Sequence, residues 1–267
     1  MEGGILNNKK KHTALVLASS SGLGLAVAKA LYREGYNVII SSRSQKLYQA
    51  EKEIKTVCGG ADVLAVPSDI TQIEDLNHLI HEGQQKFGTI DVLFTNGPGP
   101  KPGNINELEP KDFSESHQDI ILPVIYLAKR LIPGMISNKW GRIIMNTSIT
   151  AKEPADTLVL SNVYRAGLAA LAKTLSVQLA GDNITVNTVG PAVFRTERAL
   201  QLLNETSRRQ GRSVEEIERE NTKHLPMKRY NNPEEFGSVV AFLAGEAASA
   251  ITGSFIAVDG GMSHGIF

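Results

Sequence analysis

The amino-acid sequence predicts an α/β protein built on a doubly wound parallel sheet of about seven strands, with helices on both faces. Short runs rich in Val and Ile alternate along the chain with longer amphipathic stretches, which is typical of parallel sheets covered by helices. The short runs are apolar throughout, as strands buried on both faces are. With 267 residues, 42% of them hydrophobic, the chain can bury a large core.

Each element follows from this alternation. The apolar runs predicted as strands are Thr13–Ala18, Asn37–Ser41, Asp62–Pro67, Val92–Asn96, Arg142–Thr147, Thr185–Val189 and Phe255–Val258. The amphipathic stretches predicted as helices are Leu23–Glu34, Lys46–Thr56, Ile73–Lys86, Ser114–Asn138, Leu158–Ala180 and Pro233–Gly245. No linker, repeat or low-complexity stretch divides them, so we expect residues 1–267 to form a single domain.

A polar, charged segment, Thr196–Leu225, stands where a short connection would suffice. Within it Gly211 is predicted to end one helix, and Ser213 with Glu216 three residues later forms a capping-box pattern that begins another. We therefore expect a two-helix insertion at residues 196–225. Ligands of open α/β sheets bind at the carboxyl ends of the strands, so the insertion is placed to form a lid over such a site. The alternative is a pair of solvent-exposed helices that do not gate a site.

Composition and charge exclude several classes of function. The 28 basic and 28 acidic residues cancel, so the chain lacks the positive field of a nucleic-acid-binding protein. The single cysteine, Cys58, cannot form an intramolecular disulfide, and no Cys/His cluster is spaced for a metal. The N-terminal stretch lacks the apolar region of a secretion signal, and no apolar run approaches the ~18 residues that span a membrane. We therefore expect metal-free chemistry in the cytoplasm, without nucleic-acid or membrane partners.

The first predicted strand leads directly into a turn that is suited to bind phosphate. The turn runs from Ala18 to Gly24 and opens a helix, whose first backbone N–H groups lack partners and can hold a pyrophosphate. Gly22 and Gly24 remove the side chains that would block its approach. The sequence therefore predicts a nucleotide-binding turn here.

This turn resembles the Thr-Gly-x-x-x-Gly-x-Gly turn of the short-chain dehydrogenase/reductase family, a Rossmann-type fold that binds NAD(P)(H). Further segments that resemble the family are Asp69-Ile70, Thr95-Asn96-Gly97, Asn187 with Pro191-Ala192 and Thr196, Ile251-Thr252-Gly253, and Val258-Asp259-Gly260-Gly261. The resemblance implies cofactor contacts from Ala18, Ser20, Ser21, Gly22, Leu23, Gly24, Ser42, Arg43, Asp69, Ile70, Asn96, Gly97, Arg165, Pro191, Ala192, Val193 and Thr196.

The chain departs from the family pattern at two glycines, which are Ala18 and Ala192 here. Because a methyl group disfavours positive φ, we expect both turns to use backbone angles that alanine tolerates. At the end of the second strand, an acidic residue would bind the ribose 2′-OH of NAD, but Ser42 and Arg43 offer donors for a 2′-phosphate. We therefore favour NADP(H), with NAD(H) the alternative if Arg43 is merely exposed or stacks on adenine.

The resemblance implies a catalytic set of Ser, Tyr, Lys and Asn, of which the Ser alone is retained. In the family the Ser polarises the carbonyl, the Tyr delivers a proton, the Lys holds the nicotinamide ribose and lowers the pKa of the Tyr, and the Asn anchors a water relay. Ser148 matches the Ser, whereas Ser161 stands at the Tyr position and Arg165 at the Lys position. The Asn position falls on Ile120, with Asp119 beside it.

These changes leave the proton donor open. A serine hydroxyl is a poor acid, and an arginine does not titrate near neutral pH, so Arg165 is expected to position the cofactor. Tyr164 and Lys152 are the candidate proton donors. Alternatively, Tyr164 only packs in the core with its hydroxyl hydrogen-bonded, and Lys152 is an exposed loop residue. His224, near the end of the inserted segment, is expected to be an ordinary exposed histidine; the alternative is that it faces the site.

The leading hypothesis is an NADP(H)-dependent oxidoreductase that acts on a small carbonyl compound or a conjugated enone. An enone suits the loss of the Tyr, because the negative charge delocalises and solvent can protonate it, while the cofactor supplies the hydride. Keto substrates such as the 3-oxoacyl groups of similar family members would need Tyr164, Lys152 or a water in the lost role. A catalytically silent nucleotide-binding protein, acting as a sensor or partner, is the competing hypothesis.

The resemblance also implies assembly. Family members pair through two long central helices and the C-terminal strand, so we expect a homodimer or homotetramer. The apolar run Leu168–Leu179 and the ending Met262–Phe267 are the candidate surfaces. The same residues would alternatively pack against their own subunit's sheet.

Overall fold

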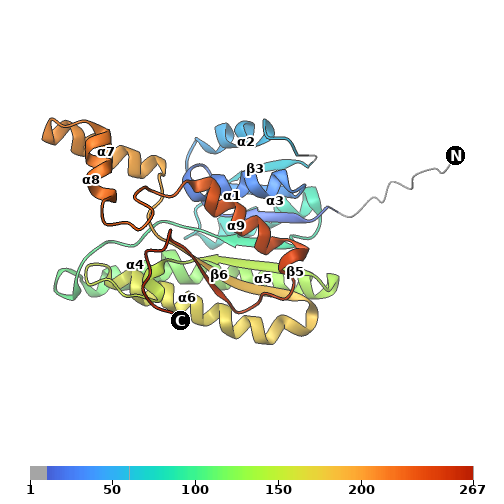
Figure 1. Cartoon of the computed structure of the whole chain (residues 1–267). Coiled ribbons are helices and arrows are strands. Elements are labelled where there is room, and N and C mark those ends of the chain that lie inside the picture. The colour runs from blue at the N-terminus through green and yellow to red at the C-terminus, as the bar shows by residue number, and fades with distance from the viewer. Residues whose placement is uncertain (1–10, 60, 267) are drawn as a thin grey trace.

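The computed structural model describes residues 11–59 and 61–266, and its centre is a parallel seven-stranded sheet (Figure 1). The strands stand in the order β3-β2-β1-β4-β5-β6-β7. Their bounds are β1 (Thr13–Val16), β2 (Asn37–Ser42), β3 (Val63–Pro67), β4 (Val92–Thr95), β5 (Gly141–Asn146), β6 (Ile184–Pro191) and β7 (Phe255–Val258). Every predicted strand is present, with small shifts at the ends, and the predicted fold class is confirmed.

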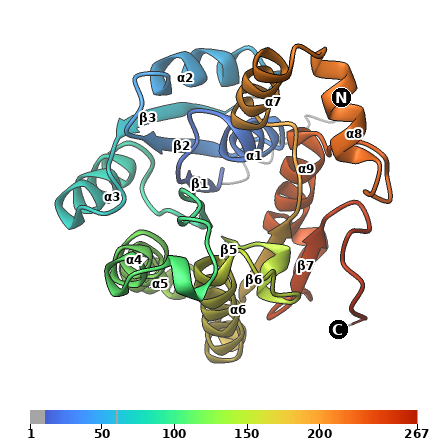
Figure 2. The ribbon, with the colours of Figure 1, turned by 90° about the vertical axis from the view of Figure 1, so that its left-hand side faces the viewer.

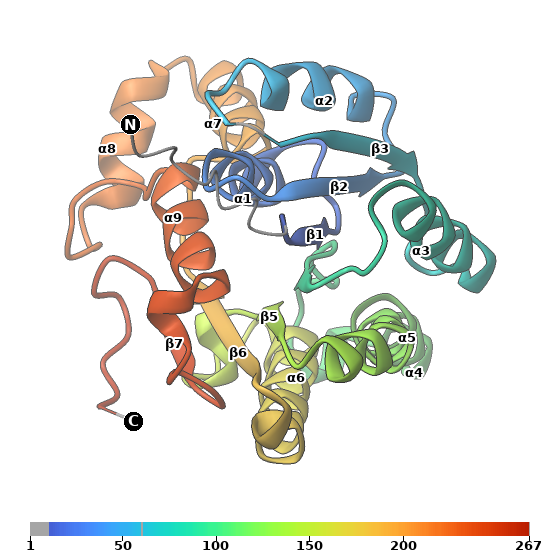
Figure 3. The ribbon, with the colours of Figure 1, turned by 90° about the vertical axis from the view of Figure 1, so that its right-hand side faces the viewer.

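Helices cover both faces of the sheet. Their bounds are α1 (Gly22–Arg33), α2 (Leu47–Lys55), α3 (Ile73–Phe87), α4 (Pro110–Ser116), α5 (Leu122–Asn138), α6 (Val159–Leu179), α7 (Glu197–Gln210), α8 (Val214–Thr222) and α9 (Pro233–Ala244). Helices α1, α2 and α9 cover one face, and α3, α5 and α6 cover the other (Figure 3). The side chains of each group form a hydrophobic core against the sheet. Because strand side chains alternate, Val16 enters the first core and its neighbour Leu15 the second.

The order of the strands creates a crevice at their carboxyl ends. The chain leaves β1 for β2 and β3 on one side of the sheet and then returns to β4 on the other. Loops after β1 and β4 therefore diverge, and open α/β sheets bind ligands at such a point. Asn96 follows β4 and donates to the Ala18 carbonyl oxygen at 3.2 Å. Asn146 ends β5 and donates to the Asn96 side-chain oxygen at 2.8 Å.

The helix predicted over Ser114–Asn138 is interrupted. A π-helical turn, His117–Ile121, stands between α4 and α5 and carries Asp119 and Ile120. Such a turn places one extra residue in the helix and is frequent at functional sites. Periodicity could not reveal it, because the apolar pattern continues on both sides.

The whole stretch Pro110–Asn138 is long and apolar enough to cross a membrane, judged by length and composition. The expectation that no apolar run approached this length was therefore wrong. In the structure α5 buries one face, which includes Val124, Leu127 and Leu131, in the core beside the sheet. A helix that lies along a sheet in this way passes the same test, so its apolar character has a structural explanation.

The inserted segment holds α7 and α8, which project beyond the sheet (Figures 1 and 2). Gly211 ends α7 with a φ of +63°, and Ser213 and Glu216 form the predicted capping box at the start of α8. The base of the segment is closed by a bridge between Phe194 and Asn231. Residues 1–10, 60 and 267, and with them the N-terminal stretch and Phe267, lie outside the described part of the chain.

Candidate active site

The turn between β1 and α1 has the close approach that a phosphate-binding turn needs. A Cβ atom at Gly24 would lie 2.3 Å from the Ala18 carbonyl oxygen, so only glycine fits there. Ala18 itself adopts a φ of +47°. The expectation of ordinary alanine angles was therefore wrong at Ala18, where the left-handed conformation costs about 1 kcal/mol. Among the described residues Ala192 has no such strain.

A cleft of about 300 Å³ opens beside this turn. Its lining residues are Ala18, Ser20, Ser21, Ser42, Arg43, Ser68, Asp69, Ile70, Thr71, Asn96, Gly97, Pro98 and Asp119. The structure thus brings together the predicted cofactor residues that follow the first four strands. Sequence reasoning missed Ser68, Thr71 and Pro98, which are the immediate neighbours of residues it named.

The inserted segment begins over the phosphate-binding turn. Thr196 caps α7, with its hydroxyl oxygen accepting from the Ala199 N–H at 3.3 Å. Its methyl carbon would lie 3.5 Å from a Cβ atom at Gly22. One residue later, Glu197 forms an ion pair with Lys46, just before α2. The predicted contact residues Gly22, Leu23 and Gly24 form the first turn of α1 beneath this connection.

Hydroxyl groups and a guanidinium gather at the end of β2. The Ser20 hydroxyl donates to the Ser42 hydroxyl oxygen at 2.9 Å. Arg43 lies 3.5 Å from an Asp69 carboxylate oxygen, and its side chain is 69% exposed. Burial alone would raise the pKa of Asp69, but hydrogen bonds from Thr71 and the charge of Arg43 lower it. Arg43 therefore stands at the cleft edge with a weak ion pair that an incoming phosphate can replace.

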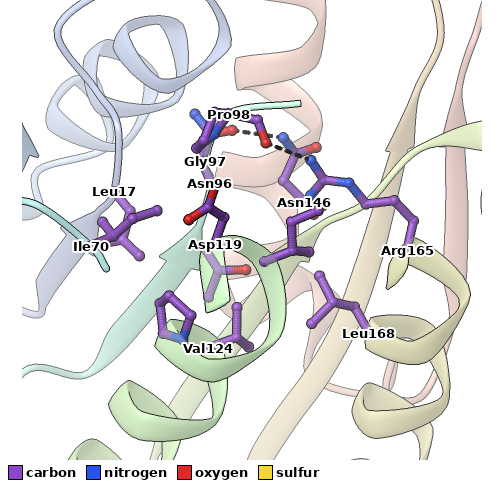
Figure 4. Close-up of a pocket in the computed structure, with 13 residues that line it drawn as sticks. Leu17, Ile70, Asn96, Gly97, Pro98, Asp119, Val124, Asn146, Arg165 and Leu168 are labelled. Carbon is purple, nitrogen blue, oxygen red and sulfur yellow. Dashed lines mark hydrogen bonds between the residues drawn. The ribbon is translucent and has the colours of Figure 1, made fainter. Parts of the chain in front are cut away.

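Arg165 crosses from α6 to the carboxyl ends of β4 and β5 (Figure 4). Its guanidinium donates to the carbonyl oxygens of Asn146 at 3.1 Å and Pro98 at 3.3 Å. The residue is 7% exposed, and burial lowers the pKa of Arg165 to about 10, so it stays charged at neutral pH. In the part of the chain that the structure describes, no carboxylate pairs with it.

A small cavity beside Arg165 contains unmet hydrogen-bonding groups. Arg165, Asn146, Thr95, Asp119 and Ile120 are among its lining residues. The side-chain oxygens of Thr95 and Asn146 are buried there without a partner. Buried polar atoms of folded proteins are rarely left unpaired. The cavity measures about 10 Å³, which is room for one water molecule, so a water fits these oxygens and a larger ligand would have to displace side chains.

The π-helical turn places Asp119 and Ile120 at this cavity. Burial raises the pKa of Asp119, which also lines the larger cleft beside the phosphate-binding turn. Ile120, which the resemblance matched to the family's Asn, is buried and apolar and so offers no anchor for a water molecule. In the sequence, the one feature that pointed to Asp119 as a site residue was its position next to the residue matched to the family's Asn.

A second cleft, of about 480 Å³, lies beside Ser148. The residues around it are Ser148, Ile149, Thr150, Glu153, Pro154, Ala155, Leu158, Pro191, Ala192, Val193, His224, Leu225, Pro226, Met262 and His264. It unites Ser148 with the predicted residues Pro191, Ala192 and Val193. His224 is exposed, as expected, and it also lines this cleft, which was the alternative.

The candidate replacement donors do not reach this cleft. The Tyr164 hydroxyl donates to the Phe113 carbonyl oxygen at 2.6 Å, and burial raises the pKa of Tyr164. Lys152 is exposed, with its ammonium nitrogen 5.2 Å from the centre of the Phe255 ring. Ser161 is buried, with its hydroxyl oxygen 2.9 Å from that of Thr150. The structure therefore places Tyr164 and Lys152 in packing and surface positions.

Comparisons with known proteins agree with this architecture. A family model described as Enoyl-(Acyl carrier protein) reductase matches residues 17–263. The NADPH-dependent reductase BacG of Bacillus subtilis (strain 168) is 31% identical over 257 residues, which cover 96% of this chain and 99% of that protein. Dehydrogenase/reductase SDR family member 4 of Bos taurus is 31% identical over 263 residues, which cover 97% of this chain and 89% of that protein.

Solved structures extend the agreement to three dimensions. YwfH, an NADPH-dependent reductase involved in bacilysin biosynthesis, is 30% identical with a TM-score of 0.88, covering 96% of this chain and 100% of its own. The L-sorbose reductase of Gluconobacter frateurii, complexed with NADPH and L-sorbose, is 29% identical with a TM-score of 0.90, covering 96% of this chain and 98% of its own. On these matches along nearly its whole length, the chain belongs to the short-chain dehydrogenase/reductase family of oxidoreductases.

Proposed function

We propose that this protein is an NADP(H)-dependent reductase of small, uncharged carbonyl compounds, conjugated enones above all, with proton delivery that does not use the family's tyrosine. The observation that carries the proposal is Arg165. It is a buried cation, held by the carbonyl oxygens of Asn146 and Pro98, at the position where the family resemblance implies a ribose-binding lysine. A protein tolerates an unpaired buried charge where a ligand uses it.

The residues of the first cleft fit a dinucleotide phosphate. Gly24 allows the close turn that exposes backbone N–H groups to a pyrophosphate. Ser20, Ser42 and Arg43 would hold a 2′-phosphate at the far end, and Arg165 would hold ribose hydroxyls at the near end. The relatives that are named as NADPH-dependent reductases support NADP(H) over NAD(H). When bound, this cofactor supplies a hydride.

The chain's own residues favour protonation by solvent. Ser148 lines the second cleft, where its hydroxyl would donate to a substrate carbonyl oxygen. The Ser161 hydroxyl is hydrogen-bonded to the Thr150 hydroxyl. Arg165 keeps its proton at neutral pH. With an enone, hydride adds to the β-carbon, the electron pair moves to the carbonyl oxygen, and the resulting enolate takes a proton from water. A simple ketone would form an alkoxide, which needs a stronger acid nearby.

The second cleft suits an uncharged substrate. Its walls are largely aliphatic and include the rings of Pro154, Pro191 and Pro226. Neither Lys nor Arg is among the described residues that line it. A substrate with a phosphate or carboxylate group in this cleft would lack a fixed cationic partner.

The test is NADPH oxidation, followed by absorbance, with 2-cyclohexen-1-one and its saturated analogue cyclohexanone. We expect kcat/KM for the enone to exceed that for the ketone by about tenfold or more. Ser148→Ala should lower the enone rate about tenfold, whereas Ser161→Ala should leave it unchanged. Equal rates for enone and ketone would contradict solvent protonation. NADPH binding without any turnover would favour the competing hypothesis of a silent nucleotide-binding sensor or partner.

We propose further that the protein is soluble, acts in the cytoplasm on a small molecule, and pairs with copies of itself through α5 and α6. Leu122, Val163 and Val177 on these helices are large, apolar and exposed, which supports pairing. Sedimentation at micromolar concentration tests the pairing. A monomer under these conditions would contradict it.

A further inference from the structure

The chain after β7 forms one wall of the second cleft. Met262 and His264 line the cleft together with Ser148. A tight turn directs them there, because the Asp259 carboxylate accepts the backbone N–H groups of Gly261 at 2.9 Å and Ser263 at 2.8 Å. The end of the chain is therefore shaped by specific hydrogen bonds next to the cleft.

This wall is continuous with the end of the inserted segment. A Cβ atom at Gly261 would lie 3.6 Å from the Pro226 side chain. Met262 also lines a small cavity with Leu225 and Met227. The residues after β7 and those after α8 thus pack as one outer wall, across the cleft from Ser148.

Glu153 joins this outer wall to the segment that carries Ser148. It lies five residues after Ser148, and its own side chain lines the cleft. One carboxylate oxygen accepts the backbone N–H of His264 at 2.6 Å and also that of Gly265. The side chain is 33% exposed, so these charge-assisted hydrogen bonds are partly shielded from water.

We propose that Glu153 is a positioning residue that holds residues Met262–Gly265 across the mouth of the second cleft and so limits the size of substrate admitted. This inference rests on the proposed function of that cleft. Among the described residues after Ser263, His264 and Gly265 are held to the opposite wall by the backbone hydrogen bonds that they donate to Glu153. The next residue, Ile266, is 88% exposed. Removal of the carboxylate frees the two N–H groups and lets the wall move outward.

Hydrogen exchange of the full-length protein tests the anchor without any substrate. The variants are Glu153→Ala, the conservative Glu153→Gln, and Asp156→Asn as a matched control on the same loop, where Asp156 is exposed. We expect the amides of His264 and Gly265 to exchange at least tenfold faster in Glu153→Ala. Exchange should be intermediate in Glu153→Gln, whose side-chain oxygen still accepts, and unchanged in Asp156→Asn. Equal exchange in wild type and Glu153→Ala would overturn the proposal.

Kinetics then test the effect on specificity. With 2-cyclohexen-1-one, Glu153→Ala should raise KM about fivefold, change kcat less than twofold and leave the Kd for NADPH unaltered. The longer enone 3-nonen-2-one should gain in kcat/KM relative to 2-cyclohexen-1-one. A fall in kcat at constant KM, or an unchanged preference between the two enones, would refute the positioning role. Absence of all turnover in the wild type would instead refute the proposed function, and the exchange experiment would still decide whether Glu153 holds the wall.

Discussion

The Arg165 guanidinium donates from Nη1 to the carbonyl oxygen of Asn146, 3.1 Å away, and so ties α6 to the carboxyl end of β5 through a buried cation. Burial lowers the pKa of Arg165 from its ordinary value to about 10. A basic group whose pKa is lower in the folded than in the unfolded protein reduces the free energy of unfolding as long as the group is charged. This reduction becomes smaller once the pH rises above the pKa of the folded state. At neutral pH the full reduction is present, which fits a residue kept for binding rather than for stability.

A first prediction concerns the pH dependence of cofactor affinity. Because Arg165 titrates at about 10, the Kd for NADPH should be constant between pH 7 and 9. In Arg165→Lys the same burial would lower the pKa of the lysine from its ordinary value of about 10.4 into this pH range. Its affinity should therefore fall about tenfold from pH 7 to 9, measured by fluorescence titration at constant ionic strength. A flat profile for the variant would count against charge binding at this position.

A second prediction separates packing from catalysis at Tyr164. Its hydroxyl donates to the Phe113 carbonyl oxygen on α4. Tyr164→Phe should lower the free energy of unfolding by about 1 kcal/mol, the usual contribution of such a bond. The value of kcat with 2-cyclohexen-1-one should be unchanged. Urea unfolding and steady-state kinetics give the two readouts, and a large loss of kcat would restore Tyr164 as a proton donor.

A third prediction concerns the strained turn at Ala18. Ala18→Gly relieves the left-handed alanine and should raise the free energy of unfolding by about 0.5 kcal/mol, after the entropy of glycine is deducted. Gly24→Ala should act in the opposite sense and abolish NADPH binding, because its Cβ would meet the Ala18 carbonyl oxygen at 2.3 Å. Gly181→Ala, where nothing lies within 4 Å, is the matched control. Retained NADPH affinity in Gly24→Ala would show that phosphate binds elsewhere.

A fourth prediction tests the choice of cofactor. Arg43 is mostly exposed and paired with Asp69, so its loss should disturb the fold little. Arg43→Ala should weaken NADPH binding about tenfold and leave NADH binding nearly unchanged, since only NADPH carries the 2′-phosphate. Added salt should reduce the difference. An equal loss for both nucleotides would assign Arg43 to adenine instead.

Much of the fold followed from local patterns. Strand and helix positions were predicted because each depends on apolar periodicity within one short stretch, as at β1 and α1. The helix ends around Gly211 and Ser213 were predicted for the same reason, since caps involve residues three or four apart. The π-helical turn at His117–Ile121 was not predicted, because it lengthens the spacing of backbone hydrogen bonds to five residues, as from the Leu122 N–H to the His117 carbonyl oxygen, within a stretch that is apolar on both sides.

The sequence by itself determined the alternation of strands and helices and the glycines of the phosphate-binding turn. It also placed Ser161 and Arg165 at the positions where the family resemblance implies a Tyr and a Lys. Only the tertiary structure decided that His224, Met262 and Glu153 share a cleft with Ser148. It also decided that Tyr164 is bound to Phe113. These outcomes depend on contacts between segments far apart in the chain, whose geometry is set by packing against a common sheet, and no local pattern encodes that geometry.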